Sequence, residues 1–238
     1  MRIVTWNVHS LTAGPEKVAD AILGEQPALV VLQEYPSSKK DGSNAVTVEA
    51  VLSANGLIPF HREAKARPFR TVVFGPIGMR RVASPPELDA DDPFWVDVEL
   101  DSVCISAVHI AIPKNIELRE MHWRTALSLV SSKSKTAHAL IGDLNTARHG
   151  IDQVDATIPG DHYLQELEAA GWTEAWRASH PESAPREYSW YYKDTGFRFD
   201  QAWLSPLLAP RLVGARMNHE VREQGLSDHS ILVVDLDV

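Results

Sequence analysis

The stretch HALIGDLNTARHG, residues 138–150, contains an apolar run that passes directly into acidic and amide side chains. Residues 139–141 are expected to form a buried strand that stops at Gly142. Because side chains alternate along a strand, Asp143 and Asn145 would project from its carboxyl end on the same side. A proton acceptor beside a neutral hydrogen-bond donor suits the hydrolysis of a phosphate ester. An Asx turn that only shapes a loop explains the same pair, so this motif alone does not decide between the two interpretations.

The composition around this stretch is that of a globular protein, with 238 residues of which 44% are hydrophobic and 23% charged. We expect one domain over residues 1–238. No apolar run approaches the roughly 20 residues that cross a membrane, and the N-terminus lacks the zones of a signal peptide. The single cysteine, Cys104, excludes an internal disulfide and is expected in a buried strand without a catalytic role. These features predict a cytoplasmic monomer that does not bind membranes.

The formal net charge of −9 argues against a protein that coats nucleic acid through bulk electrostatics. The charge is unevenly distributed, because residues 61–81 contain six cationic side chains, namely Arg62, Lys65, Arg67, Arg70, Arg80 and Arg81. A solvated loop explains such a stretch, and so does a basic rim that holds a polyanionic substrate. On the second interpretation, Arg67 and Arg70 are candidate substrate-binding residues.

The remaining chain alternates between strand-like and helix-like segments. Helical periodicity is found near residues 15–26, 44–56, 115–132 and 162–170. Strands are expected near residues 2–8, 28–34, 71–74, 94–100, 103–109, 137–141, 198–204, 211–218 and 231–237. Many strands with interspersed helices predict an α/β (α+β) fold in which two sheets pack together with helices outside.

Polar side chains end several of these expected strands or follow them closely. They are Asn7, Glu34, His109, Asp143 with Asn145, Asp200, and the loop residues Asp228 and His229. Carboxylate and carbonyl oxygens are the hard ligands that Mg²⁺ accepts. Each residue by itself is more often a structural polar group at a strand end. Their common placement predicts a single site for phosphate and metal chemistry.

The ordered motifs TWNVH, LQE, VHI, GDLN, RFDQAWL and SDHS, between residues 3 and 233, resemble those of the endonuclease/exonuclease/phosphatase superfamily. The resemblance implies the deoxyribonuclease-I-like fold. This is a four-layered sandwich of two facing mixed β-sheets with helices on the outer faces. It also implies that the protein cleaves a phosphate ester with Mg²⁺ or Mn²⁺ as cofactor.

The resemblance also implies roles for individual residues. Asn7 and Glu34 resemble metal-site residues, and Asp228 resembles a further carboxylate near the metal or one at a second metal. Asp143 resembles the aspartate that aligns and deprotonates the attacking water, and Asn145 the neighbour that binds the phosphate.

The remaining roles concern charge on the phosphate. His229 resembles the histidine that stabilises the transition state, and Asp200 the residue that orients it. His109 resembles a histidine that bonds a phosphate oxygen or assists the leaving group.

We therefore expect a metal-dependent phosphodiesterase, with a nuclease favoured and nucleic acid as the expected form of the phosphodiester substrate. A small-molecule or lipid phosphatase or phosphodiesterase of the same fold is the alternative. A non-catalytic binding module would be expected to have lost Glu34, Asp143 or His229, and all three are present.

Other polar and aromatic residues are assigned mainly to the surface or the core. Most of the remaining histidines are expected at the surface, with His9 and His149 as candidates for the rim of the site. Arg119 is expected on a solvated helix face. The aromatic run EYSWYY, residues 187–192, is expected to serve packing more than substrate stacking.

Overall fold

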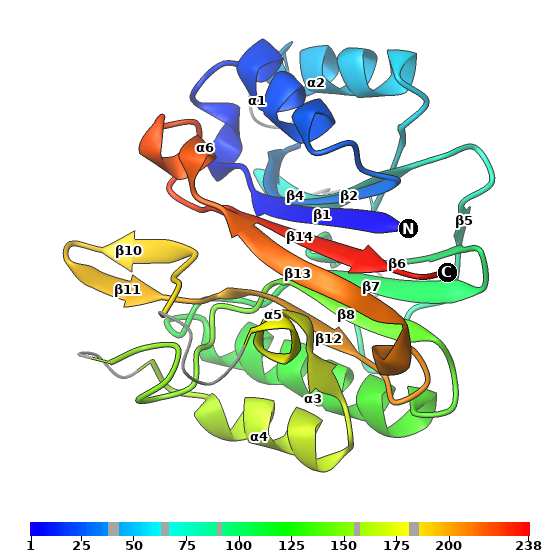
Figure 1. Cartoon of the computed structure of the whole chain (residues 1–238), viewed down its shortest axis with the longest axis vertical. Coiled ribbons are helices and arrows are strands. Elements are labelled where there is room, and N and C mark those ends of the chain that lie inside the picture. Colours follow the sequence, from blue (N-terminus) through cyan, green and yellow to red (C-terminus); the bar gives the residue numbers. More distant parts are fainter. Residues whose placement is uncertain (38–42, 63–66, 90–91, 155–157, 181–185) are drawn as a thin grey trace.

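Two six-stranded mixed β-sheets face each other in the computed structural model of the chain, which describes residues 1–37, 43–62, 67–89, 92–154, 158–180 and 186–238 (Figure 1). In the first sheet, the strands in spatial order are β13 (Leu212–Asn218), β14 (Ile231–Leu236), β1 (Arg2–Asn7), β2 (Leu29–Pro36), β4 (Phe69–Gly75) and β3 (Ile58–His61). In the second they are β5 (Arg80–Arg81), β6 (Trp95–Leu100), β7 (Val103–His109), β8 (His138–Asp143), β12 (Asp200–Leu204) and β9 (Thr173–Glu174).

Each sheet is built around a parallel pair, β1 with β2 and β7 with β8, and its other pairings are antiparallel. A separate hairpin joins β10 (Trp190–Tyr192) to β11 (Thr195–Phe197). The helices are α1 (Pro15–Gly24), α2 (Ser43–Ala54), α3 (Ile116–Lys133), α4 (Asp161–Ala169), α5 (Ala175–Ser179) and α6 (Glu220–Glu223).

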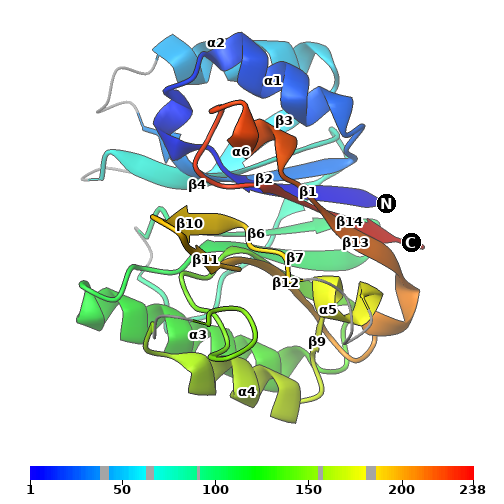
Figure 2. The ribbon, with the colours of Figure 1, turned by 60° about the vertical axis from the view of Figure 1, so that its left-hand side comes forward.

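The helices form the outer layers of the sandwich. Helices α1 and α2 cover the first sheet, and α3 and α4 cover the second, so that four layers stack in both views (Figures 1 and 2). Helix α3 buries Trp123, Ala126, Leu129 and Val130, whose spacing of three or four residues places them on one face. The four-layered α/β sandwich expected from the sequence is confirmed.

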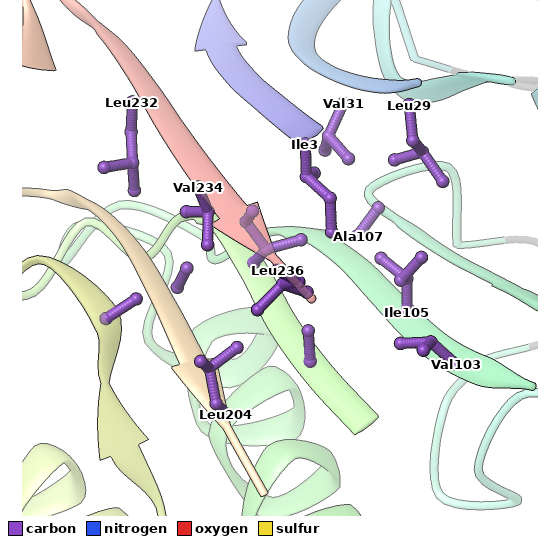
Figure 3. Close-up of a cluster of buried hydrophobic side chains, with 14 of the residues drawn as sticks. Ile3, Leu29, Val31, Val103, Ile105, Ala107, Leu204, Leu232, Val234 and Leu236 are labelled. Atoms are coloured by element: carbon purple, nitrogen blue, oxygen red, sulfur yellow. The ribbon is translucent and has the colours of Figure 1, made fainter. Parts of the chain in front are cut away.

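The core between the sheets is formed by every second residue of their central strands. Ile3 and Val31 of the first sheet belong to the same buried cluster as Ile105 and Leu204 of the second sheet (Figure 3). The intervening residue Val4 belongs to a different buried cluster, under helices α1 and α2. This period of two fixes which side chains lie between the sheets.

The same alternation changes from apolar to polar at one edge of the sandwich. In β7 the inward positions run from Val103 through Ile105 and Ala107 to His109. In β8 they run from Ala139 through Ile141 to Asp143, in β1 from Ile3 to Asn7, and in β12 from Leu204 back to Asp200. The candidate site residues His109, Asp143, Asn7 and Asp200 therefore occupy the polar end of the layer that forms the core.

Strand β8 differs from its expected limits, because it continues through Gly142 to Asp143. Gly142 adopts φ +145°, and a Cβ at this position would lie 1.9 Å from the carbonyl oxygen of Val108. The glycine does not end the strand; it allows β7 and β8 to approach closely just before Asp143. Cys104 lies in β7 as expected, although it is only partly buried.

In the described residues, we find no helix with both the length and the apolar character needed to cross a bilayer.

Candidate active site

Asp143 lies at the centre of the polar edge. Its Oδ2 atom accepts a hydrogen bond from Asn7 Nδ2 at 3.0 Å. The same oxygen lies 3.6 Å from His109 Nε2 and 4.0 Å from His229 Nε2. The carboxylate is 1% exposed, so its position is set by these neighbours and by the end of β8. Strands from both sheets thus direct hydrogen-bonding groups toward one oxygen atom.

Asn145 follows Asp143 in a left-handed conformation, with φ 45°. Its backbone N–H donates to Asp143 Oδ1 at 2.9 Å, which is the Asx-turn contact considered from the sequence. Its side-chain Nδ2 donates to the carbonyl oxygen of Ile110 at 2.9 Å, and both Asp143 and Asn145 line the same cavity. The two interpretations of this motif therefore hold together, since the turn itself places both side chains at the site.

His229 and Asp200 form a buried pair behind Asp143. The Nδ1 atom of His229 is 2.8 Å from Asp200 Oδ2, and the two residues are 5% and 0% exposed. Burial by itself lowers the pKa of His229, but the Asp200 carboxylate, with a further contribution from Asp143, outweighs burial and raises this pKa to about 10. The imidazolium is therefore the form present at neutral pH, with Nδ1–H donated to Asp200 and Nε2–H directed toward Asp143.

Replacing Asp200 by asparagine should lower the pKa of His229, because the largest attraction is removed while burial remains. The high-pH limb of the kcat profile, expected near pH 10 in the wild type, should move to lower pH. Because the folded pKa of His229 exceeds the ordinary value of 6.5, protonation of His229 contributes stability that is fully present below pH 6.5 and is lost as the pH rises through 10. An NMR titration of the His229 ring in both proteins measures the shift directly, and an unchanged pKa would contradict the assignment.

Glu34 reaches the site through an irregularity in β2. The register between β2 and β4 shifts between Leu32 and Tyr35, and Glu34 has φ 51°. An extra residue in one strand reorients the side chains at that point. Glu34 Oε1 accepts a bond of 3.3 Å from Asn7 Nδ2, so the two predicted metal-site residues are in contact.

The segment after Asn7 carries backbone strain beside the site. His9, Ser10 and Leu11 have φ values of 41°, 65° and 57°, a left-handed conformation that residues other than glycine seldom adopt. The turn lets the His9 backbone N–H donate to Asn7 Oδ1 at 3.1 Å. It also places His9 Nδ1 3.2 Å from Asp228 Oδ1. His9 is thus a rim residue, as expected.

Several of these residues line one cavity of about 310 Å³, whereas Asn7, His109 and Asp200 lie behind or beside its lining. It is lined by Glu34, Asp143, Asn145, Asp228, His229 and His9, together with apolar groups that include Trp190 and Phe199. Trp190 Nε1 donates to Asp228 Oδ2 at 3.0 Å, and its ring stacks on Phe199 with centroids 5.5 Å apart. The aromatic run therefore packs against its neighbours and also forms a wall of the cavity.

Two expected positions lie elsewhere. Arg70 is 9% exposed and lies against Glu49 and His61, with its guanidinium 5.8 Å from the Tyr35 ring centroid, so it does not line the cavity. His149 forms an isolated bridge with Gln153 and is not a lining residue. Arg67 lines a neighbouring cavity, and Lys65 lies outside the described residues.

Arg119 is not on a solvated helix face, because it is 5% exposed. Its guanidinium donates to the carbonyl oxygens of Ala111, Asn145 and Pro159 at 2.9, 3.2 and 2.8 Å, and to the Thr146 hydroxyl at 2.5 Å. These acceptors belong to two connections, from β7 to α3 and from β8 to α4. They are separated from Arg119 in the sequence, and no local pattern in α3 indicates them.

Two histidines expected at the surface are also buried. His122 is 1% exposed and bridges the Ala111 backbone N–H and Asp92. His138 is 3% exposed, with Nε2 3.0 Å from the Ser106 hydroxyl, and burial lowers its pKa to about 4. In both cases polar partners from neighbouring loops and strands make burial possible.

The donor set suits a hard divalent cation. Glu34, Asp143 and Asp228 line one cavity, and no lysine or arginine in the described ranges forms an ion pair with any of them. Mg²⁺ is commonly held by one or two carboxylates and retained waters. In the part of the chain that the structure describes, no group of three or more His, Cys, Asp or Glu is positioned to hold an ion. Asn7 presents its Nδ2 to Glu34, so ligation through Oδ1 would require the amide to turn.

The model of the Endonuclease/Exonuclease/phosphatase family matches residues 4–229 of the chain. Similar solved structures include a 3′ phosphatase (NExo) from Neisseria bound to a product DNA hairpin, with 21% identity and a TM-score of 0.81. They also include an AP endonuclease from Archaeoglobus fulgidus, with 17% identity and a TM-score of 0.83, and both alignments cover 100% of each chain. An AP endonuclease from Leishmania major has 18% identity and a TM-score of 0.76, covering 98% of this chain and 86% of its own. No curated protein sequence matches the chain.

Proposed function

The chain belongs to the endonuclease/exonuclease/phosphatase family, and on that premise we propose that it is a divalent-metal-dependent phosphodiesterase that cleaves nucleic acid. The observation that carries the proposal is the cavity lined by Asp143, His229, Glu34 and Asp228, beside which His109 Nε2 lies 3.6 Å from Asp143 Oδ2. It combines a proton acceptor, a cationic donor and hard oxygen ligands, which are the groups that hydrolysis of a phosphate ester requires.

Asp143 is the proposed general base. Water attacks phosphorus, the bond from phosphorus to the leaving oxygen breaks, and Asp143 Oδ2 takes the proton of the water. Asn145 N–H and Asn7 Nδ2 hold the carboxylate in place for this transfer. Asn145 uses one amide hydrogen to bind Ile110, and the second is assigned to a phosphate oxygen.

The two histidines are assigned to charge that develops on the phosphate. His229 presents a charged Nε2–H 4.0 Å from Asp143 Oδ2, where it opposes negative charge on the transition-state oxygens. His109 Nε2 lies 3.6 Å from the same oxygen and bonds a phosphate oxygen or the leaving group. Asp200 orients His229 and does not itself touch the substrate.

Mg²⁺ or Mn²⁺ is the proposed cofactor, held by Glu34 with Asn7, and by Asp228 if the site takes a second ion. Bound there, the ion would supply Lewis-acid polarisation of a phosphate oxygen. Glu34 and Asp228 both line the cavity.

A substrate panel tests the proposed function. Single- and double-stranded DNA, RNA, a small phosphodiester and a phosphomonoester are incubated with the protein in Mg²⁺ or Mn²⁺, beside the Asp143→Asn variant. Metal-dependent cleavage of a nucleic acid that the variant lacks is the expected result. Turnover of the phosphomonoester alone would replace the proposal by a phosphatase, and no turnover of any substrate would refute it.

Glu34→Gln tests the metal role separately. The substitution keeps the shape of the side chain and removes the charge that holds the ion, so we expect the metal concentration for half-maximal rate to rise at least several-fold. Activity should recover as Mg²⁺ or Mn²⁺ is raised. A rate that remains low at saturating metal would show that Glu34 has a role beyond holding the ion.

A further inference from the structure

A second cavity, of about 240 Å³, adjoins the catalytic one on the side of His109. Its walls include Arg67, Phe94, His109, Ala111 and Asn115, and we call it the Phe94 cavity. Glu34 and Ile112 line both cavities, so the two are neighbours on either side of the predicted metal-site residue Glu34. Building on the proposed function, we infer that the Phe94 cavity binds the nucleobase of a nucleotide next to the scissile phosphate.

The Phe94 ring is held at a defined angle. It makes edge contacts with His109, with centroids 5.7 Å apart and an interplanar angle of 85°, and with His122, at 6.3 Å and 75°. The Arg67 guanidinium lies 6.0 Å from the ring centroid. One face of an aromatic ring is thus paired with an exposed cation, which can move outward to admit a planar group between them.

A buried polar pair supports this wall from behind. Asp92 accepts a bond of 2.8 Å from the Phe94 backbone N–H through Oδ1, and its Oδ2 lies 2.8 Å from His122 Nε2. His122 Nδ1 accepts the Ala111 backbone N–H at 3.1 Å, so the ring hydrogen is on Nε2. Asp92 and His122 are 4% and 1% exposed. The pair fixes the backbone of two lining residues, Phe94 and Ala111, at once.

The chemistry of the walls favours a nucleobase over a phosphate or a lipid chain. Every base has a π face that stacks on an aromatic ring or an arginine, and the Phe94 cavity offers both. Asn115 adds a carboxamide that does not cap α3 and can bond a base edge. The volume suits one ring system, since whole small-molecule sites are larger, at about 300–1,000 Å³. Glu34 also lines the Phe94 cavity, and its negative charge disfavours the binding of a further phosphate there.

The test uses short DNA strands in which a single linkage is an ordinary phosphodiester and the others are uncharged methylphosphonates. One strand carries all its bases, and two others lack the base on the 5′ or the 3′ side of that linkage. kcat/KM is measured for the wild type, Phe94→Leu, Arg67→Ala and the matched control Arg80→Ala, which removes a charge remote from both cavities. Phe94→Leu keeps an apolar side chain and removes the π face.

In the wild type, loss of the base on one side should lower kcat/KM by about tenfold, mainly through KM. Phe94→Leu should lower it about tenfold for the complete strand and less than twofold for the strand that lacks this base. Arg67→Ala should act in the same direction, and Arg80→Ala should change none of the values. Equal effects of Phe94→Leu on all three strands, or no effect of base removal on either side, would overturn the inference.

A binding measurement separates this inference from the proposed function. Fluorescence anisotropy compares the complete and base-lacking strands on Asp143→Asn and on the double variant with Phe94→Leu. A base preference that disappears in the double variant supports the Phe94 cavity even if turnover proves weak. Absence of any base preference in binding would overturn the nucleobase inference. The phosphodiesterase proposal would still stand if the substrate panel described above shows cleavage.

Discussion

Replacing Asp143 by asparagine should lower kcat by about 10²–10⁴-fold, because a positioned general base contributes a factor of this size. The side chain keeps its shape, and Asn145 N–H can still donate to its oxygen. What is lost is the proton acceptor, which no cation can replace. The defect should therefore persist at every concentration of Mg²⁺ or Mn²⁺, as measured by metal titrations of kcat.

Glu34→Gln is the matched control, since it also replaces a carboxylate of the same cavity by a carboxamide and removes one negative charge. His229→Ala should behave like Asp143→Asn, because it removes stabilisation of transition-state charge and leaves substrate binding largely intact. If metal restores Asp143→Asn but not Glu34→Gln, the roles of the two carboxylates are reversed.

Replacing Arg198 by methionine should have the largest effect on stability, about 3–5 kcal/mol. The guanidinium is 1% exposed and makes ion pairs of 2.8 Å with Asp152 and with Glu174, which are themselves 3% and 5% exposed. It also lies 4.8 Å from the Trp176 ring centroid. Without it, buried Glu174 loses this cation and buried Asp152 keeps only Arg177 among the described residues, so the melting temperature should fall by roughly 10 °C in a thermal unfolding experiment.

Arg80→Met is the comparison for this change. Arg80 pairs with Glu99 at 2.6 Å, but its side chain is 65% exposed, and exposed pairs are worth about 0–1 kcal/mol. A melting temperature close to that of the wild type is expected. If the two variants were equally destabilised, burial would not be the reason for the importance of Arg198.

The long elements were predictable because their periodicity is strong. The alternation in Val103–His109 predicted β7 within its observed bounds, and the order of the six motifs predicted the family to which the chain belongs. The short strands β5 and β9, of two residues each, were missed. Strands of this length are too short to show a period, and their pairing depends on neighbours supplied by the fold.

The site was predictable to the extent that strand ends define it. His109, Asp143 and Asp200 lie on inward positions of consecutive neighbours in one sheet, and the sequence predicted each of them at or near a strand end without predicting the order of the strands. Arg119 and His122 could not be placed, because their partners come from loops far along the chain. Polar and charged residues in a helix are mostly exposed. Arg119 and His122 are buried because the assembled loops supply their hydrogen-bond partners.

The alternation that carries His109, Asp143, Asn7 and Asp200 into the space between the sheets has a consequence for how this scaffold can change. Deleting one residue from the interior of β7 or β8 would turn the terminal side chain from the space between the sheets toward the helix layer, whatever residue was removed. The strands are therefore intolerant of length variation even at positions far from the substrate. Segments that begin beyond the strand ends, such as the one from Ala111 to Asn115, are free of that restriction. New substrate preferences can arise there by insertion or loss while the hydrolytic chemistry is inherited unchanged.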